Sequence, residues 1–288
     1  MLRVELASGS CAEDVAGRLR EHDSNGLLAV TVVDRPGVAA LVIDTNRKSA
    51  DERVADIVLD ADAELAGQVD RLWSQRLGPF AARLAGTTPV KPEPAVLRDH
   101  DPGLLVAARR LLDRLRTGLR RAGLDDGQWT YDHIGSTSVP ELRAKRFIDL
   151  QLGVAPLPEE GSATGSAMDE VLAAVGYSPA RGARPDSPGV HRDGILDPDL
   201  APADAYRKRL FFRPDPPQPS ILHVRQLGCP WWSYTVAFRD WLRADPAGRR
   251  AYEQMKQQAA QAHAHDADYD DYTRAKASFF RQVQRHYE

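Results

Sequence analysis

The residues best able to do chemistry lie between positions 130 and 226, and most of them are cationic. They flank stretches whose apolar residues alternate or run together as in β-strands: His133, Lys145, Arg146, Lys208, Arg209, Arg213, His223 and Arg225. Ammonium and guanidinium groups gathered at strand ends favour an anionic ligand, such as the phosphate of a nucleotide. A purely structural domain has no need to collect so many cations in one region, so we predict a binding site there.

A turn of small residues precedes most of these cations in the chain. Its sequence, Gly135-Ser136-Thr137-Ser138, follows the stretch 129–134, which predicts a strand. Backbone N–H groups in such a turn can hold a phosphate together with the hydroxyls of Ser136 and Thr137. Taken alone, the same composition is also typical of an ordinary tight turn, and both interpretations stay open at this point.

The elements that must position these side chains follow from the apolar pattern. Strands are expected over 147–154, 207–212 and 221–227. Because Asp149 and Gln151 alternate with apolar residues, they must point to the same side of their strand. His223 and Arg225 share a face for the same reason. If the strands pair, the Cβ atoms of facing residues lie about 5 Å apart.

Strand pairing would bring a larger set of side chains together. We expect one cleft to collect Ser136, Lys145, Asp149, Lys208, Arg209, His223 and Arg225. The alternative is a buried ion pair between Asp149 and one arginine, with the cleft closed. Segment 178–204 is dense in Pro, Gly and Asp and predicts a long loop that shapes the pocket. Helices are expected over 102–122, over 168–175 and after 231, with Lys256 and Lys276 as solvated helix residues or as further ligand contacts.

The first ~85 residues carry a separate pattern. Residues 2–7, 27–33, 38–44 and 55–59 predict strands, and residues 64–84 predict a helix. Residues 86–96, GTTPVKPEPAV, have the composition of a linker. We therefore predict a small α/β unit over 1–85, a linker over 86–96, and a larger α/β (α+β) domain over 97–288.

Bulk properties narrow the function classes. The 288-residue chain has a formal net charge of -3, so no global basic field indicates nucleic acid or an anionic membrane as a partner. Cys11 and Cys229 have no CxxC spacing, which argues against a zinc cluster and favours a reducing cytoplasm. The expected partner is a small nucleotide or phosphate ligand, and the oligomeric state stays open.

Several ordered motifs carry a family resemblance. The segment Asp132–Asp149, DHIGSTSVPELRAKRFID, resembles the GrpB signature, in which an HIGSTAVPGL-type turn leads to AKPxID. Further motifs resemble the family in the same order, and the match covers roughly residues 95–288: Arg98–Leu112, Leu222–Arg225, Phe238–Pro246, Tyr252–Lys256 and Tyr272–Lys276. The resemblance implies a nucleotidyltransferase fold, a mixed sheet with C-terminal helices.

The resemblance also implies roles for residues. Asp149 would hold a divalent metal such as Mg²⁺ or act as a base. His223 is a further catalytic candidate by its residue type, with core packing as the alternative. Ligand contacts would come from His133, Gly135, Ser136, Thr137, Lys145, Lys208, Arg209 and Arg225. The second acid of such a site should stand two residues after Asp149, where this chain has Gln151, and the later strand offers His223 and Arg225. The acid set is therefore incomplete.

The N-terminal unit has a weaker resemblance of its own. Residues 54–60 with 64–80 look like the C-terminal end of dephospho-CoA kinases, which in actinobacteria often carry a fused GrpB domain, and Met1–Val4 looks like that enzyme's first strand. A P-loop with a phosphate-binding lysine should follow that strand. The chain has no lysine there, and Glu5 and Glu13 would repel phosphates. We therefore expect a kinase remnant without kinase activity.

Two functions remain. The first is a transferase of the nucleotidyltransferase fold that binds a nucleotide or another phosphate-bearing ligand. The second is a non-catalytic folding or regulatory module related to coenzyme A biosynthesis. The cationic cluster favours the first, and the incomplete acid set favours the second.

Overall fold

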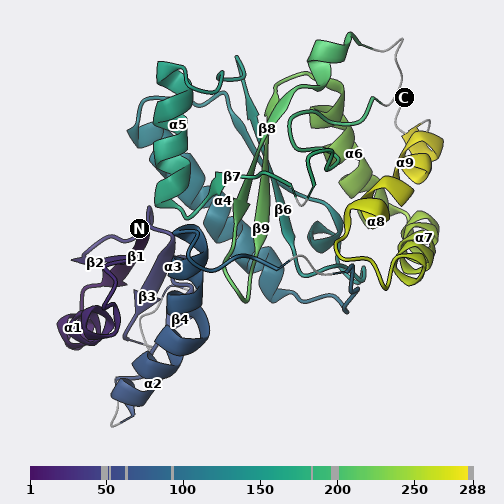
Figure 1. The fold of residues 1–288 in the computed structure, drawn as a ribbon. Helices are drawn as coiled ribbons and strands as arrows, with labels where there is room; N and C mark the ends of the chain where they lie inside the picture. The colour runs from purple at the N-terminus through teal and green to yellow at the C-terminus, as the bar shows by residue number, and fades with distance from the viewer. Residues whose placement is uncertain are drawn as a thin grey trace.

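The computed structural model describes residues 1–46, 51, 53–61, 64–91, 94–182, 184–195 and 201–284. Its strands form two sheets, one of four strands and one of five. Figure 1 shows the smaller sheet at the N-terminal end of the molecule, with the larger sheet between two groups of helices. The chain is thus a mixed α/β protein, as the sequence predicts.

The N-terminal sheet is wholly parallel, in the order β2-β1-β3-β4. Its strands are β1 (Leu2–Ala7), β2 (Leu28–Val33), β3 (Leu41–Asp44) and β4 (Ile57–Val58). Although β2 and β3 lie on either side of a short turn segment in the sequence, β1 lies between them in space. The uninterrupted apolar run of β3 is typical of a strand covered on both faces, and Leu41, Val42 and Ile43 are all buried.

Helices cover the face of this sheet that carries Leu2, Val4 and Leu6. They are α1 (Ala12–His22), α2 (Leu65–Leu72) and α3 (Gly78–Leu84), with a π-helical turn at Trp73–Leu77 between the last two. Pro79 lacks the N–H that would continue the α-helical ladder, and a widened turn before it is a common response. Leu77 and Phe80 still reach the core of the unit.

The five-stranded sheet has the order β5-β6-β9-β8-β7 and is mixed. Strands β6 and β9 pair in parallel, and the other pairs are antiparallel. The strands are β5 (Thr130–Ile134), β6 (Ile148–Val154), β7 (Ser178–Pro179), β8 (Lys208–Arg213) and β9 (Ser220–Gln226). The sequence pattern predicts β5, β6, β8 and β9 to within one or two residues, because each carries a buried apolar row.

The two faces of this sheet are covered differently. On one face, α4 (Gly103–Arg121) and α5 (Ala163–Ala174) pack against Leu150, Leu222 and Val224 to form the main core. The other face carries Asp149, and the C-terminal helices lie on that side (Figure 1). These helices are α6 (Pro230–Ala244), α7 (Pro246–Ala262), α8 (Asp270–Ala275) and α9 (Ala277–Val283). They pack around Phe238 and Tyr252 in an aromatic cluster.

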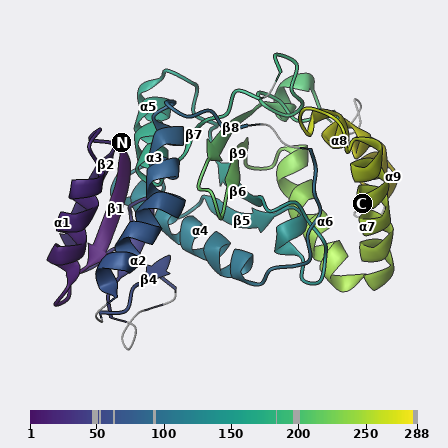
Figure 2. The ribbon, with the colours of Figure 1, turned by 60° about the horizontal axis from the view of Figure 1, so that its bottom comes forward.

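The N-terminal unit is docked on the larger domain by buried arginines. Arg213 donates to the carbonyl oxygen of Ala40 at 2.7 Å and forms an ion pair with Asp215. Arg76 reaches the same Asp215 carboxylate from the N-terminal unit at 2.7 Å. Figure 2 shows the unit beside α4 and α5, on the side away from α7 and α9. None of the helices in the described ranges is both long enough and apolar enough to cross a lipid bilayer.

Candidate functional site

The turn between β5 and β6 is shaped by Gly135 and Ser138. Gly135 has a φ of 69°, in the left-handed region that favours glycine. Ser138 Oγ donates to the Gly135 carbonyl oxygen at 2.6 Å and closes the turn. A Cβ atom on Gly135 would lie 2.4 Å from Oδ2 of Asp149, so only glycine allows this approach. The turn and Asp149 are therefore in direct contact.

Asp149 lies near the start of β6, on the side facing the C-terminal helices. By strand register it shares its face with Gln151 and His223, and Leu150 points the other way into the core. Its side chain is half-buried, and among the described residues it accepts no hydrogen bond and forms no ion pair within 4.0 Å. Burial raises the pKa of this carboxyl, and the positive charges of Lys145 and Lys276 oppose the rise.

Two lysines near Asp149 lie against aromatic rings. Lys145 Nζ is 3.7 Å from the ring centroid of Tyr269 and 5.4 Å from that of Tyr272. Lys276 Nζ is 4.8 Å from the Tyr272 ring. Among the described residues, neither ammonium group donates a hydrogen bond. Both are held by cation–π attraction and by the field of Asp149, not by a carboxylate in contact.

A third lysine completes the group. Lys256 Nζ donates to Ser136 Oγ at 3.2 Å and to the carbonyl oxygen of Arg143, and it lies over the ring of Tyr252. The side chain is only 1% exposed. We call Lys145, Lys256 and Lys276 the lysine cluster. Its amines come from the 135–147 connection, from helix α7 and from the α8–α9 junction. Lys256 contacts Ser136 of the turn, whereas Lys145 and Lys276 lie in the field of Asp149.

The amines of the lysine cluster have lowered pKa values, so they lose a proton more readily than exposed lysines do. Burial, followed by the charge of Lys276, lowers the pKa of Lys145 to about 7, and the same two causes lower that of Lys256 to about 7. Burial lowers the pKa of Lys276 as well. Ser136, Lys145, Asp149 and Lys276 are half-buried, so solvent reaches the cluster. The carboxylates of Asp149 and Asp270 oppose the fall for Lys145, Asp149 opposes it for Lys276, and Glu253 opposes it for Lys256, yet the pKa of each amine stays lowered.

A second group of cations lies on the same face and already has a carboxylate in contact. Lys208 Nζ donates to Asp193 Oδ1 at 2.6 Å, and Arg225 donates to the same carboxylate through Nε at 2.7 Å and Nη2 at 3.0 Å. We call Asp193, Lys208, His223 and Arg225 the Asp193 cluster. The pKa of Lys208 falls to about 8 through burial, although Asp193 opposes the fall. Burial alone would raise the pKa of Asp193, but Arg225 and Lys208 lower it.

His223 is neutral in this arrangement. Its Nδ1 lies 3.0 Å from Lys208 Nζ and 3.1 Å from Arg225 Nη2, and both of those groups are donors. Nδ1 must therefore accept, which places the remaining proton on Nε2. Burial and then the charges of Lys208 and Arg225 hold its pKa well below the usual value. His223 can donate through Nε2 but does not add positive charge.

The side-chain amide of Gln151 is hydrogen-bonded at both its oxygen and its nitrogen. Its Oε1 accepts from Arg225 Nη1 at 2.6 Å and from Thr235 Oγ1 at 2.8 Å, and its Nε2 donates to the carbonyl oxygen of Trp232 at 3.0 Å. The residue is completely buried. Gln151 therefore positions Arg225 and does not replace the second acid of a metal site.

The prediction that Arg209 joins this face is wrong. Register pairs Lys208 with Arg225, so Arg209 points to the opposite face, where Nη2 forms an ion pair with Asp169 of α5 at 2.7 Å. Arg213 also lies on that face, in the contact with the N-terminal unit. A strand presents alternate residues to alternate faces, so consecutive cations cannot both reach one ligand.

His133 and Thr137 brace the turn and do not face Asp149. Thr137 is buried, and its Oγ1 donates to the carbonyl oxygen of Phe147 at 3.0 Å and lies 3.1 Å from His133 Nε2. Since Thr137 has only one hydroxyl proton, His133 must be the donor of the second contact. Burial, then Arg243 and Arg239, lower the pKa of His133 to about 3. Both residues fix the start of β6 relative to the turn.

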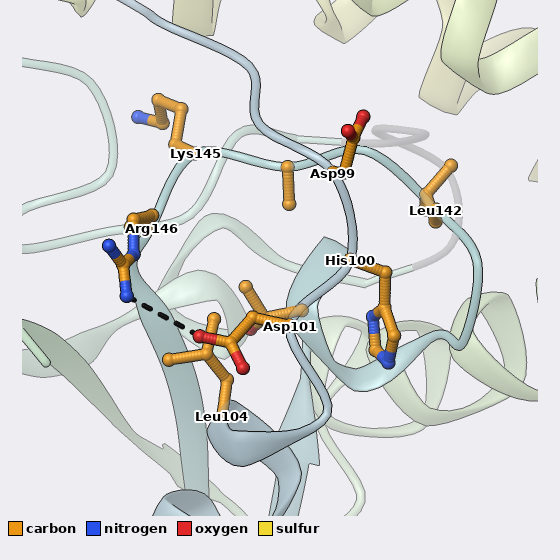
Figure 3. Close-up of a pocket in the computed structure, with 9 residues that line it drawn as sticks. Asp99, His100, Asp101, Leu104, Leu142, Lys145 and Arg146 are labelled. Atoms are coloured by element: carbon orange, nitrogen blue, oxygen red, sulfur yellow. Dashed lines mark hydrogen bonds and ion pairs between the residues drawn. The ribbon is translucent and has the colours of Figure 1, made fainter.

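Lys145 and Arg146 diverge from each other. Figure 3 shows Arg146 reaching Asp101 while Lys145 points away from the 99–101 segment. A cavity of about 10 Å³, enough for a single water molecule, lies between these two segments. Arg146 therefore belongs to the rim of this cavity and not to the lysine cluster.

Three residues of the site were poorly anticipated by the sequence. Lys256 and Lys276 were expected chiefly as solvated helix residues, yet Lys256 contacts the turn at Ser136 and Lys276 lies in the field of Asp149. The available signal was the repeated Tyr-x-x-x-Lys spacing of Tyr252–Lys256 and Tyr272–Lys276, because residues four apart share one helix face. Asp193 lies in the long loop, where no periodicity predicts which side chain turns inward.

The residues around Asp149 do not fit a Mg²⁺ ion. Among the described residues, no group of three or more His, Cys, Asp or Glu side chains is placed to hold a metal. Mg²⁺ is bound through carboxylate and water oxygens, whereas the neighbours of Asp149 are amines that would compete for it and repel a cation. The chemistry that these side chains support is binding of an anion.

Comparisons with known proteins agree with the motif pattern. The family model described as GrpB protein matches residues 94–286. A dephospho-CoA kinase of Mycolicibacterium paratuberculosis is 34% identical over 264 residues, which cover 87% of this chain and 60% of that protein. A UPF0157 protein of Deinococcus radiodurans is 30% identical over 184 residues, covering 64% of this chain and 77% of that protein.

The comparison with solved structures gives a match as well. The crystal structure of conserved protein GrpB from Enterococcus faecalis superposes with a TM-score of 0.47 at 22% identity, covering 66% of this chain and 96% of that one. The chain spans about 60% of the length of the mycobacterial relative named above, and its 264-residue alignment is too long to fit within the family match alone. By the family match over residues 94–286, the chain belongs to the GrpB family.

Proposed function

We propose that this protein binds a phosphate-bearing ligand of the nucleotide class, with the phosphate at the lysine cluster. The observation that carries the proposal is the gathering of three buried lysine amines beside the turn and Asp149. Lys256 donates to Ser136, while Lys145 and Lys276 lie in the field of Asp149 without a carboxylate in hydrogen-bond contact among the described residues. Two of these amines donate no hydrogen bond among the described residues. An anion at this position would accept hydrogen bonds from amines that otherwise have only aromatic rings as neighbours.

Electrostatics favours an anion over a neutral ligand. Buried like charges lower one another's pKa, so the free site holds fewer protons than three exposed lysines would. A bound phosphate reverses that tendency, and charge-assisted hydrogen bonds in a partly dry site are among the stronger polar contacts in proteins. The hydroxyl of Ser136 and the backbone of its turn add neutral donors.

Binding without metal-dependent transfer is the form of this proposal that the site supports best. Metal-dependent transfer requires carboxylates that hold the ion against the phosphate oxygens, and Asp149 stands alone among amines. Asp149 instead acts as an internal counter-ion of Lys145 and Lys276. The alternative is a regulatory or folding module related to coenzyme A biosynthesis. The lack of further metal-binding carboxylates beside Asp149 favours it, and so does the kinase name of the mycobacterial relative.

The test is calorimetric titration with inorganic phosphate, sulfate and ATP, each with Mg²⁺ and with EDTA. We expect binding in EDTA, and a ligand at 100 times its Kd should stabilise the fold by about 2.7 kcal/mol in a thermal melt. Substituting Lys145, Lys256 and Lys276 singly by Met should weaken each titration. Lys91→Met, an exposed lysine in the linker, is the matched control and should bind as the wild type does. Equal binding by all four variants would refute the site.

Asp149→Asn separates the counter-ion role from a metal role. If Asp149 only balances the lysine cluster, loss of its charge should tighten phosphate binding in EDTA, because the amines lose their competing anion. If Asp149 holds a metal, the same substitution should abolish a Mg²⁺-dependent component of binding. Circular dichroism before titration establishes that the variant is folded.

A further inference from the structure

The Asp193 carboxylate is held in the way that proteins hold a ligand's anion. Arg225 grips it with Nε and Nη2 in a two-pronged contact, and Lys208 donates to it at 2.6 Å. All three side chains are at least nine-tenths buried. A fork of this kind matches carboxylate and phosphate geometry equally well. Asp193 comes from a loop, whereas its partners come from the central strands β8 and β9.

The loop that carries Asp193 is attached elsewhere mainly by polar contacts. Arg184 pairs with Asp268 at 2.9 Å, and Ser187 donates to Asp270 at 2.5 Å, both at the start of α8. The Arg184 side chain is 34% exposed and that of Asp268 is 8% exposed, so water reaches this ion pair from the arginine side. Val190 is the buried apolar residue of this loop segment. The 184–195 loop is thus held over the sheet with few apolar contacts.

The two cation groups are neighbours on one sheet face. Asp149 pairs in register with Ile221, and Gln151 pairs with His223. His223 of the Asp193 cluster therefore lies two residues further along the sheet than Asp149, which neighbours the lysine cluster. Two residues of strand span about 7 Å. The field of Lys208 and Arg225 reaches Asp149 together with that of Lys145 and Lys276. One extended anion could therefore contact both groups.

We propose that Asp193 is an internal anion filling a second phosphate subsite, and that the natural ligand carries two or more linked phosphates. This inference rests on the proposed function, since the first phosphate occupies the lysine cluster. The ligand displaces the Asp193 carboxylate from Lys208 and Arg225, and the 184–195 loop moves away with it. Selectivity for a diphosphate over a single phosphate follows. Only the longer anion has a second phosphate that can take the place of the displaced Asp193 carboxylate at Lys208 and Arg225.

The experiment compares inorganic phosphate with pyrophosphate in EDTA. Asp193→Asn keeps the side-chain shape but removes the competing charge, so we expect pyrophosphate affinity to rise roughly tenfold while phosphate affinity stays within twofold, a difference of about 1.4 kcal/mol. Asp126→Asn, an exposed aspartate after α4, changes the net charge equally and is the matched control. An unchanged pyrophosphate affinity, or an equal gain for both anions, would overturn the second subsite.

Hydrogen exchange on the wild-type protein gives a test that does not depend on the variant folding. The amide of Asp193 donates to the Tyr206 carbonyl at 2.9 Å, so it is protected in the free protein. Pyrophosphate should speed exchange in 184–195, and phosphate should not. If phosphate fails to bind at all, the proposed function fails. If phosphate binds and pyrophosphate leaves loop exchange unchanged, the second subsite alone fails.

Discussion

At the scale of single residues, the lysine cluster differs from most buried charge in proteins. Buried lysines usually face a carboxylate, as Lys208 faces Asp193. Lys145 instead faces Tyr269, and Lys256 faces a hydroxyl, a carbonyl oxygen and a ring. Rings and neutral oxygens compensate a buried charge only in part, so these amines hold their protons weakly. Under the proposed function, a bound anion would supply the compensating charge.

This weak proton binding predicts a pH-dependent stability. An unfolded lysine has a pKa near 10.4, whereas Lys256 titrates at about 7 in the folded protein. Between these values the unfolded state binds more protons, so the free energy of unfolding rises with pH. Lys256→Met should reduce that slope by up to about 1.4 kcal/mol per pH unit between pH 7 and 10.

Urea unfolding at several pH values measures this slope. Lys91→Met, whose amine is exposed, should leave the slope unchanged. A Lys256→Met curve parallel to that of the wild type would show that Lys256 titrates normally in the folded protein.

Some of the site could be predicted from the sequence, and the rest shows where such reasoning stops. Alternation places Asp149 with Gln151 and His223 with Arg225, and the register agrees. The same rule, applied to the consecutive pair Lys208 and Arg209, would have excluded one of them. Asp193 was not predictable, because a loop has no period and its inward residue is chosen by tertiary partners.

At the scale of elements, the turn between β5 and β6 places the site. Gly135 adopts a left-handed conformation and brings its Cα against Asp149, while Ser138 closes the turn behind it. Helix α7 then docks through Lys256 on Ser136. The connection from 135 to 147 thus fixes the strand that carries the acid and the helix that carries an amine. The sequence predicted the turn and the strand, but the docking of α7 depends on long-range packing.

Gly135→Ala should destabilise the fold through two effects. The alanine would have to adopt a φ near 69°, which costs about 1–2 kcal/mol. Its Cβ would also displace Asp149, against which it would lie at 2.4 Å. Gly161→Ala is the matched control, because φ there is 77° with no atom within 4 Å of the added carbon. Denaturation of both variants isolates the contact, and equal losses would mean that Asp149 moves freely.

At the scale of the whole molecule, the N-terminal unit is part of the folded body. Asp215 receives Arg213 from its own strand end and Arg76 from the unit, and its side chain is completely buried. Arg114 of α4 adds a pair with Asp56 at 2.7 Å on the same junction. The composition of residues 86–96 predicted a linker, but composition cannot reveal an ion pair such as Arg76–Asp215, whose residues are 139 positions apart.

Asp215→Ala should therefore loosen the junction. Removing one partner of a buried ion pair typically costs about 3–5 kcal/mol, because the remaining charges stay buried without compensation. Here two arginines would be left. We expect a lower unfolding midpoint and faster hydrogen exchange in β1 and β3. Asp51→Ala, which breaks an exposed pair with Arg53, should change neither. An unchanged unfolding midpoint with unchanged exchange in β1 and β3 of Asp215→Ala would show that the junction adds no stability.

The lowered proton affinity of the lysine cluster has a chemical consequence. An unprotonated amine is a nucleophile, and near neutral pH only amines with a pKa as low as that of Lys145 carry a substantial unprotonated fraction. A mild acylating reagent should therefore mark Lys145 before the exposed Lys91. A ligand that keeps Lys145 protonated would protect it from acylation. The extent of acylation at this residue can be measured from the masses of its peptides, and it offers a way to screen for the natural ligand.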